Sequence, residues 1–157
     1  MSKMSQQNKI NGQKIKTYFN KIDKKTNKKQ LKKKLDKLWR EVALLKYGDK
    51  CEYYRCYKTE NLNVHHIISR RKLTTRWDLD NAMVLCPLHH TLSNDAAHSD
   101  INFKDKILGK YPGFKAIRDE RWFTKLELKA NTPQKLDLKL ELIYLQKEHD
   151  RYYKSKC

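Results

Sequence analysis

The chain has 157 residues and a formal net charge of +18 at pH 7, because 36 Lys and Arg face only 18 Asp and Glu. This length fits one compact domain with appended elements, and no apolar run approaches the roughly 18 residues of a membrane-spanning helix. The Lys-rich beginning lacks the apolar stretch of a signal peptide, so we expect a cytoplasmic protein without a membrane partner. So large a positive charge favours nucleic acid as the partner, since each neutralised phosphate releases counterions; a charge that only maintains solubility is the alternative.

The positive charge is concentrated at the beginning of the chain. Residues 1–37 contain thirteen Lys and only Asp23 and Asp36 as acidic residues, which gives this stretch +11 of the total +18. Residues 1–29 also lack apolar periodicity. We therefore expect a basic, flexible arm that contacts phosphates, with one short helix around 13–22.

From residue 30 the pattern changes to that of an amphipathic helix. Apolar residues recur at steps of four and three, which places them on one face of a helix. These residues are Leu31, Leu35, Leu38, Val42 and Leu45. The segment 30–49 is thus expected to lead into the core as a helix, with Gly48 as its C-cap.

Residues 50–98 are expected to form the core of the protein. Two short runs of β-forming residues, 62–68 and 82–85, flank a polar loop that is rich in Arg. Pro87 stands where the first turn of a helix over 87–97 would lie. The predicted order is strand, strand, helix, with Cys and His residues at the junctions.

Residues 99–157 are expected to add a helical extension. Apolar spacing predicts three helices, around 101–107, over 114–129 and over 132–153. Thr132 followed by Pro133 is typical of a helix start. The chain as a whole is therefore expected to be an α+β protein.

Three cysteines, Cys51, Cys56 and Cys86, lie near the junctions of the core. Without an export signal they favour metal ligands over disulfides. His89 follows Cys86 by three residues, which places it near Cys86 on the expected helix. These four side chains have the type and number that a structural Zn²⁺ binds tetrahedrally; reduced, packed thiols are the alternative. Cys157 is expected to be a free thiol.

Five of the six histidines lie within one stretch of the core, and four of them form two adjacent pairs. Neighbouring residues of a strand point to opposite faces, so His65 and His66 are expected to serve different functions. On the helix, His90 and Asn94 are four residues apart and share a face. A second group of candidate site residues therefore contains His65, His66, Asn81 and His90, with Asn94 and His98 in reserve. Such a group suits a metal held by neutral imidazoles beside a histidine that acts as a base.

The order of these residues resembles that of the HNH, or ββα-metal, endonucleases. The matching segments are His65-His66, Asn81 and Cys86-Pro-Leu-His89-His90. The resemblance implies that His65 and His90 bind a catalytic cation, that His66 is the general base, and that Asn81 fixes the loop and orients the base. Members with a His-His start, such as the colicin-type DNases, imply a further ligand at Asn94, whereas His98 is expected to stabilise the helix end electrostatically.

The resemblance further implies metal-dependent hydrolysis of double-stranded DNA and a ββα-metal core with a zinc knuckle. The cation would be Mg²⁺ or Mn²⁺, and the imidazole ligands admit Ni²⁺ or Zn²⁺ as well. The wider pattern resembles small bacteriophage HNH endonucleases, which implies DNA processing or recombination in the cytoplasm of a bacterial host. One departure concerns the knuckle: the family usually begins Cys-x2-Cys, whereas Tyr54 stands at that position here and Cys56 makes the spacing Cys-x4-Cys.

Four basic residues follow the expected base in the loop between the strands: Arg70, Arg71, Lys72 and Arg76. We expect them to contact phosphates beside the bond that is cut, because phosphates must approach the base for any chemistry; a solvated loop is the alternative. Trp77 is expected to pack beneath this loop.

Two other functions stay open from the residues alone. A non-catalytic zinc-finger DNA-binding protein would use the histidines to complete a structural site, although the chain offers more ligands than one tetrahedral zinc binds. A nuclease directed at RNA would carry the same positive charge.

Overall fold

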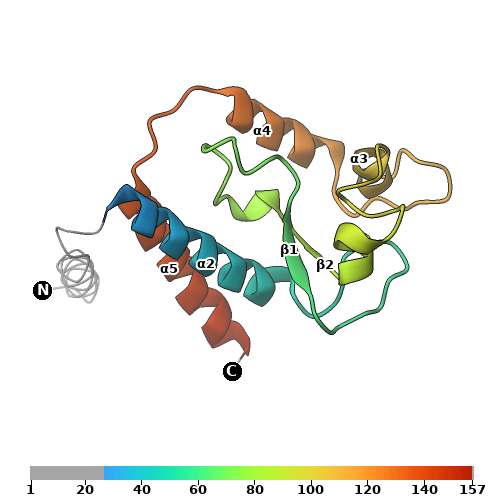
Figure 1. Ribbon diagram of the computed structural model, residues 1–157, viewed down its shortest axis with the longest axis horizontal. Helices are drawn as coiled ribbons and strands as arrows, with labels where there is room; N and C mark the ends of the chain where they lie inside the picture. Colours follow the sequence, from blue (N-terminus) through green and yellow to red (C-terminus); the bar gives the residue numbers. More distant parts are fainter. Residues whose placement is uncertain (1–26, 157) are drawn as a thin grey trace, which may run out of the picture.

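The computed structural model describes residues 27–156 (Figure 1). In chain order its elements are α2 (Lys28–Tyr47), β1 (Asn63–His66), η1 (Leu79–Asn81), β2 (Ala82–Leu85), η2 (Leu88–Leu92), α3 (Phe103–Ile107), α4 (Glu120–Asn131) and α5 (Leu138–Lys156). The protein is therefore α+β, as expected, with one small sheet and several helices. The expected short helix around 13–22, most of the expected arm and the expected free thiol of Cys157 lie outside the described residues. Within the described chain, no helix combines the length and the apolar character that crossing a membrane requires.

The prediction of an amphipathic helix leading into the core is confirmed by α2. Its N-cap is Asn27, whose side chain accepts a hydrogen bond from the backbone N–H of Gln30 (3.0 Å). At the other end the N–H of Gly48 donates to the carbonyl of Leu44 (2.8 Å), so the predicted C-cap is also confirmed. The buried residues of this helix are Leu31, Leu35, Trp39, Val42 and Ala43.

The sheet consists of β1 and β2, which pair antiparallel with His65 opposite Met83 and His66 opposite Ala82. All four residues of β2 are buried, whereas only His65 is buried in β1. The strands thus form in the two predicted regions, although β1 is shorter than the predicted run.

Two hydrophobic clusters surround the sheet. The first joins α2, α5 and the end of the loop before β2, and its buried residues are Leu31, Leu35, Trp39, Val42, Ala43, Trp77, Leu79, Ala82, Leu142 and Leu145. The second joins β2, α3, α4 and two cysteines, and its buried residues are Cys51, Tyr53, Met83, Leu85, Cys86, Phe103, Ile107, Leu108 and Phe123. Helices α2 and α5 lie side by side although they are far apart in the sequence (Figure 1).

The helix expected over 87–97 is much shorter than predicted. η2 ends at Leu92, because Ser93 leaves the helix with φ −115° and ψ 165°. The Ser93 hydroxyl donates to the carbonyl of Leu88 (2.9 Å), a local bond that competes with continuation of the helix. The chain forms turns and bends over 93–99 instead.

The two later helices begin at side-chain caps that apolar spacing does not reveal. Asp119 accepts from the N–H of Trp122 (2.6 Å), so α4 begins after it and not near residue 114. Asp137 accepts from the N–H of Lys139 (2.8 Å), so α5 begins after it and not at the predicted Pro133. Both predicted helix starts were therefore wrong.

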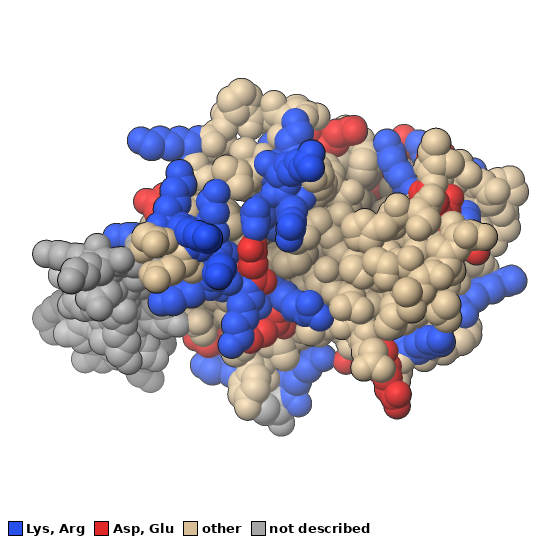
Figure 2. Space-filling view, in the orientation of Figure 1, with Lys and Arg blue, Asp and Glu red and all other residues tan. Residues whose placement is uncertain are grey.

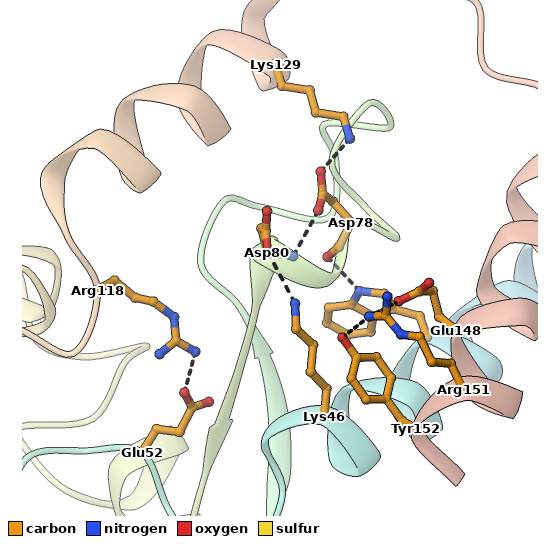
Figure 3. Close-up of polar contacts among 10 residues, drawn as sticks. Lys46, Glu52, Asp78, Asp80, Arg118, Lys129, Glu148, Arg151 and Tyr152 are labelled. Carbon is orange, nitrogen blue, oxygen red and sulfur yellow. Dashed lines mark hydrogen bonds and ion pairs between the residues drawn. The ribbon is translucent and has the colours of Figure 1, made fainter. Parts of the chain in front are cut away.

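Ion pairs attach the flanking helices to the segment that enters β2 (Figure 3). Lys46 of α2 lies 3.4 Å from Asp80, and Lys129 of α4 pairs with Asp78. The indole Nε1 of Trp39 also donates to the carbonyl of Asp78 (2.9 Å). The residues directly before β2 are thus held from two sides.

Candidate metal centres and active site

One group of ligands, which we name the Cys3His cluster, consists of Cys51, Cys56, Cys86 and His89. Their ligand atoms all lie within 4.8 Å of one another. The Sγ atoms of Cys56 and Cys86 are 3.9 Å apart, and His89 Nδ1 lies 3.6 Å from Cys51 Sγ and 3.3 Å from Cys86 Sγ. A tetrahedral Zn²⁺ with ordinary bond lengths separates two sulfurs by about 3.8 Å and a sulfur from a nitrogen by about 3.6 Å. The cluster therefore fits a tetrahedral metal ion.

A tight turn accommodates the unusual Cys-x4-Cys spacing. The N–H of Cys56 donates to the carbonyl of Tyr53 (2.9 Å), and Arg55 between them adopts φ +59°, in the left-handed region. The turn accommodates the two residues that Cys-x4-Cys has beyond Cys-x2-Cys. The thiol of Cys56 therefore lies near that of Cys51. No glycine marks the left-handed position, so the sequence holds no local signal for the turn.

Burial makes the Cys3His cluster dependent on a compensating positive charge. Burial raises the pKa of the Cys51 thiol to about 12, and the hydrogen bond with the Cys56 side chain acts in the same direction. Several thiolates cannot coexist in such a site unless a cation offsets their charge, and a bound metal ion deprotonates the thiols that ligate it. The ring of Tyr53 stacks on His89 with centroids 4.0 Å apart, which holds the imidazole in place.

A second group, the three-histidine cluster, consists of His65, His90 and His98. The Nε2 atoms of His90 and His98 are 3.3 Å apart, and the ring of His65 lies 5.5 Å and 4.8 Å from their rings. Two nitrogens that share a tetrahedral Zn²⁺ are separated by about 3.3 Å. This cluster could therefore also hold a metal ion. His65 is buried but His98 is exposed, so the cluster opens to solvent on one side.

Two rings of the three-histidine cluster, those of His65 and His90, have lowered pKa values. Burial, together with the neighbouring His98 and His90, lowers the pKa of His65 to about 3. Burial also lowers the pKa of His90. Both rings are neutral at pH 7, and neutral imidazole is the form that ligates a metal.

His98 joins His65 and His90, whereas Asn94 lies outside the helix on which it was expected. Asn94 lies beyond the end of η2 and is exposed, so it does not share a helical face with His90 as predicted. The N–H of Ala97 donates to the carbonyl of His89 (2.8 Å), which folds the following chain back and places His98 beside His90. The expectation that His98 ends a long helix was therefore wrong, because that helix does not form.

A buried ion-pair network holds the turn that carries His98. Lys106 of α3 is almost fully buried, and its Nζ lies 2.6 Å from a carboxylate oxygen of Asp95 and 2.8 Å from one of Asp100. These two carboxylates flank His98 in the sequence. The position of His98 thus depends on α3, which lies outside residues 50–98. The spacing of possible ligands in the sequence could therefore not predict it.

His66 lies in a different environment from its neighbour His65. Its ring stacks on Trp39 of α2, with centroids 4.0 Å apart and an angle of 15° between the planes. His66 Nε2 lies 2.9 Å from the carbonyl of Arg76. A carbonyl only accepts, so Nε2 carries the proton and Nδ1 of the neutral ring keeps its lone pair. Burial lowers the pKa of His66, which favours this neutral form at pH 7.

Asn81 is fully buried and fixes the loop after β1. Its Oδ1 accepts from the N–H of Ile68 (2.6 Å), and its Nδ2 donates to the carbonyls of Ile68 and Thr75 (both 2.9 Å). These bonds hold both ends of the loop against the start of β2. Asn81 therefore acts as a positioning residue inside the protein, because its amide has no side free for a substrate.

Asp36 of α2 also fixes the second end of this loop, at Arg76 and Trp77, and the sequence did not indicate this role. Its carboxylate accepts from Arg76 Nε (2.9 Å), from a terminal nitrogen of Arg76 (2.7 Å) and from Trp77 Nε1 (2.7 Å). Burial raises the pKa of Asp36, but the hydrogen bonds from Arg76 and Trp77 outweigh this effect and lower it overall. Trp77 is buried beneath the loop, as predicted. Arg76 was expected to contact phosphate, but its guanidinium pairs with Asp36 and its carbonyl accepts from His66.

The other basic residues of the loop are exposed. Arg70 and Arg71 form no ion pair within residues 27–156. Lys72 donates to the side-chain oxygen of Asn131 in α4 (3.0 Å), so its ammonium is partly engaged. The loop therefore presents Arg70 and Arg71 to solvent. Burial lowers the pKa of His66, and the positive charge of Arg70 acts in the same direction.

Comparisons of this chain with protein-family models, with curated proteins and with solved structures find no match. The functional interpretation accordingly depends on the geometry of the two clusters and of His66.

Proposed function

We propose that this protein is a metal-dependent endonuclease of the ββα-metal (HNH) type, which hydrolyses phosphodiester bonds of double-stranded DNA. The observation that carries the proposal is the open three-histidine cluster together with His66, which directly follows His65 in β1. His66 is a neutral imidazole whose Nε2 is hydrogen-bonded and whose Nδ1 has no hydrogen-bond partner among the described residues. An open metal site distinguishes catalytic from structural centres, and a neutral imidazole is a suitable general base near pH 7.

In the proposed mechanism His66 removes a proton from the attacking water through Nδ1. Nε2 remains bonded to the carbonyl of Arg76, which stabilises the imidazolium formed after proton transfer. The stacked ring of Trp39 prevents rotation of the imidazole. Asn81 and Asp36 contribute indirectly, because they hold the loop that supplies this carbonyl.

His65, His90 and His98 would hold the catalytic cation. When bound there, a divalent cation acts as a Lewis acid on the phosphate and offsets the charge that develops on the leaving oxygen. Three imidazole nitrogens favour Zn²⁺ or Ni²⁺ and bind Mn²⁺ more weakly, whereas Mg²⁺ prefers oxygen ligands. The three histidines therefore make Mg²⁺ a less suitable catalytic cation than the sequence resemblance implied. We assign structural Zn²⁺ to the Cys3His cluster, which has all four ligands and therefore no free position for substrate.

The net charge of +18 and the exposed Arg70 and Arg71 support a polyanionic substrate. The sequence resemblance to small bacteriophage HNH endonucleases adds DNA processing or recombination in a bacterial host as the proposed setting.

The proposal is tested by incubating supercoiled plasmid with the purified protein and Mn²⁺, Ni²⁺, Zn²⁺ or Mg²⁺ in separate reactions. We expect nicked or linear product, and we expect His66→Ala to lower the cleavage rate by about 10²- to 10⁴-fold, the usual contribution of a positioned base. His149→Ala, which removes a histidine of α5, is the matched control and should cut at nearly the wild-type rate. A gel shift without cleavage under every cation would instead support a non-catalytic DNA-binding protein.

A further inference from the structure

A basic hollow lies beside the first turns of α2. Its lining consists of Lys28, Lys29, Lys32, Lys33, Asp36 and Arg76, and its volume is about 460 Å³. Figure 2 shows Lys and Arg side chains gathered on this part of the surface, whereas the neighbouring part of the same face carries few charges.

The charges of the basic hollow are not balanced by other residues of the segment 27–156. Five of its six lining residues are cationic and one is anionic, which gives the lining a net charge of +4. The carboxylate of Asp36 is already engaged by Arg76 and Trp77. None of the four lysines forms an ion pair with another residue of the part of the chain that the structure describes.

The position of the lysines disfavours the helix that carries them. Lys28 and Lys32, and likewise Lys29 and Lys33, are four residues apart, so like charges are neighbours on one face. The first turn of α2 contains no acidic residue, although the positive end of the helix dipole favours one there. Like-charged neighbours and a first turn without an acidic residue are expected where a bound anion supplies the negative charge that the helix lacks.

Arg76 connects the basic hollow to the proposed active site. Its guanidinium lines the hollow, while its carbonyl accepts the hydrogen bond from His66 (2.9 Å). One residue thus takes part in both the hollow and the environment of His66.

We propose that the basic hollow binds the phosphodiester backbone of duplex DNA on one side of the bond that is cut. This proposal rests on the proposed function for the position of that bond. The lining favours a duplex over a single strand, because single-strand sites use aromatic side chains for base stacking and this lining contains none. Lysines contact phosphates as point charges and read no base, so binding here is independent of sequence.

The experiment compares two variants of the full chain that lose the same charge. The first carries Lys28→Gln, Lys29→Gln, Lys32→Gln and Lys33→Gln, and the control carries Lys50→Gln, Lys115→Gln, Lys147→Gln and Lys154→Gln at exposed positions outside the hollow. Binding of a fluorescent duplex is measured by anisotropy over a range of salt concentrations, without added divalent cation, so that no cleavage intervenes. Thermal unfolding followed by circular dichroism verifies that both variants are folded.

We expect the hollow variant to lower the slope of log affinity against log salt by about 2 to 4, since each duplex phosphate contact contributes about 0.9. The control should change the slope by less than about 1. Should the quadruple variant unfold, Lys29→Gln with Lys33→Gln is expected to lower the slope by about 1 to 2. Equal changes in hollow and control variants would overturn the proposal, because charge alone would then explain binding. A greater loss of affinity for single-stranded RNA than for the duplex would also overturn it.

The two proposals fail in distinguishable ways. If the wild-type protein cuts DNA but the hollow and control variants bind alike, the basic hollow is not a DNA site and the proposed function stands. If the wild-type protein cuts DNA with none of the cations, but the hollow variant has a lower slope of log affinity against log salt than the control, the proposed endonuclease function is wrong. The proposal that the basic hollow binds DNA then stands.

Discussion

The two ligand clusters differ in closure although they share one short helical turn. His89 of η2 enters the Cys3His cluster, where all four tetrahedral positions have a protein ligand and two cysteines are fully buried. His90, the next residue, enters the three-histidine cluster, which includes the exposed His98 and has no fourth His, Cys, Asp or Glu ligand among the described residues. A closed cluster can only stabilise the fold, whereas an open one leaves a position for a reacting group. Under the proposed function, the number of converging ligands, and not residue type, would therefore distinguish a structural from a catalytic histidine.

The largest expected effect is a difference between the two clusters in how much each contributes to the free energy of unfolding. Cys86→Ser should lower the free energy of unfolding by about 4 kcal/mol or more, because loss of a structural metal removes folding energy. His90→Ala, on the same turn but in the open cluster, should lower it by no more than about 1 kcal/mol. Urea denaturation with zinc analysis of both variants provides the measurement. Equal destabilisation would show that the clusters do not differ in structural role.

A smaller effect concerns which residues bind a metal ion in the three-histidine cluster. His98→Ala should weaken binding of Mn²⁺ or Ni²⁺ at this cluster by about 10- to 100-fold or more, since even residues that only support a ligand contribute that much. Asn94→Ala should leave the affinity within about twofold, because Asn94 is exposed beyond the end of η2. Calorimetric titration of the zinc-loaded protein distinguishes the two. The reverse order of effects would restore Asn94 as the ligand.

A positioning effect is expected at Asp36, which touches neither cluster. Asp36→Asn should lower kcat about tenfold with KM and metal affinity little changed, because it loosens the loop that orients His66. Asp36→Glu should recover part of the loss. Asp80→Asn, which alters an exposed ion pair with Lys46, is the control and should keep wild-type kcat. A change in KM alone would assign Asp36 to DNA binding instead.

The smallest effect is a pH dependence of stability when the open cluster holds no cation. The pKa of His65 is about 3 in the folded protein and about 6.5 in the unfolded chain. The unfolded chain therefore binds more protons between these values, so stability is complete above pH 6.5 and falls as the pH is lowered. From pH 7 to pH 5.5 we expect His65 to account for a loss of about 1 kcal/mol. Urea denaturation should show a weaker pH dependence for His65→Gln; an unchanged dependence would contradict burial of a neutral ring.

Local patterns in the sequence predicted the elements whose causes are themselves local. The four-and-three spacing with Gly48 predicted α2, and β-forming runs predicted both strands. The grouping of Cys51, Cys56 and Cys86 with His89 was also expected, and the structure brings these side chains together. The chemical roles of His65 and His66 stay predictions that await the experiments above.

Features that depend on distant residues could not be predicted. The place of His98 depends on Lys106, whose buried ammonium holds the turn through Asp95 and Asp100. The orientation of His66 depends on Trp39 and Asp36, which lie on a helix that apolar spacing identified only as a core element. Such tertiary contacts leave no periodic signal in the chain.

The pairing of α2 with α5 has a consequence for the synthesis of the protein. Leu142 and Leu145 of α5 complete the cluster that buries Trp39, the residue stacked on His66. A nascent chain that ends before α5 leaves this face of α2 uncovered, and long-range contacts of this kind form late in folding. The ribosome must therefore have passed α5 before the imidazole of His66 is held in its final place. If the proposed endonuclease function holds, the nascent chain would therefore be unable to cut nucleic acid until α5 had been synthesised and had packed against α2.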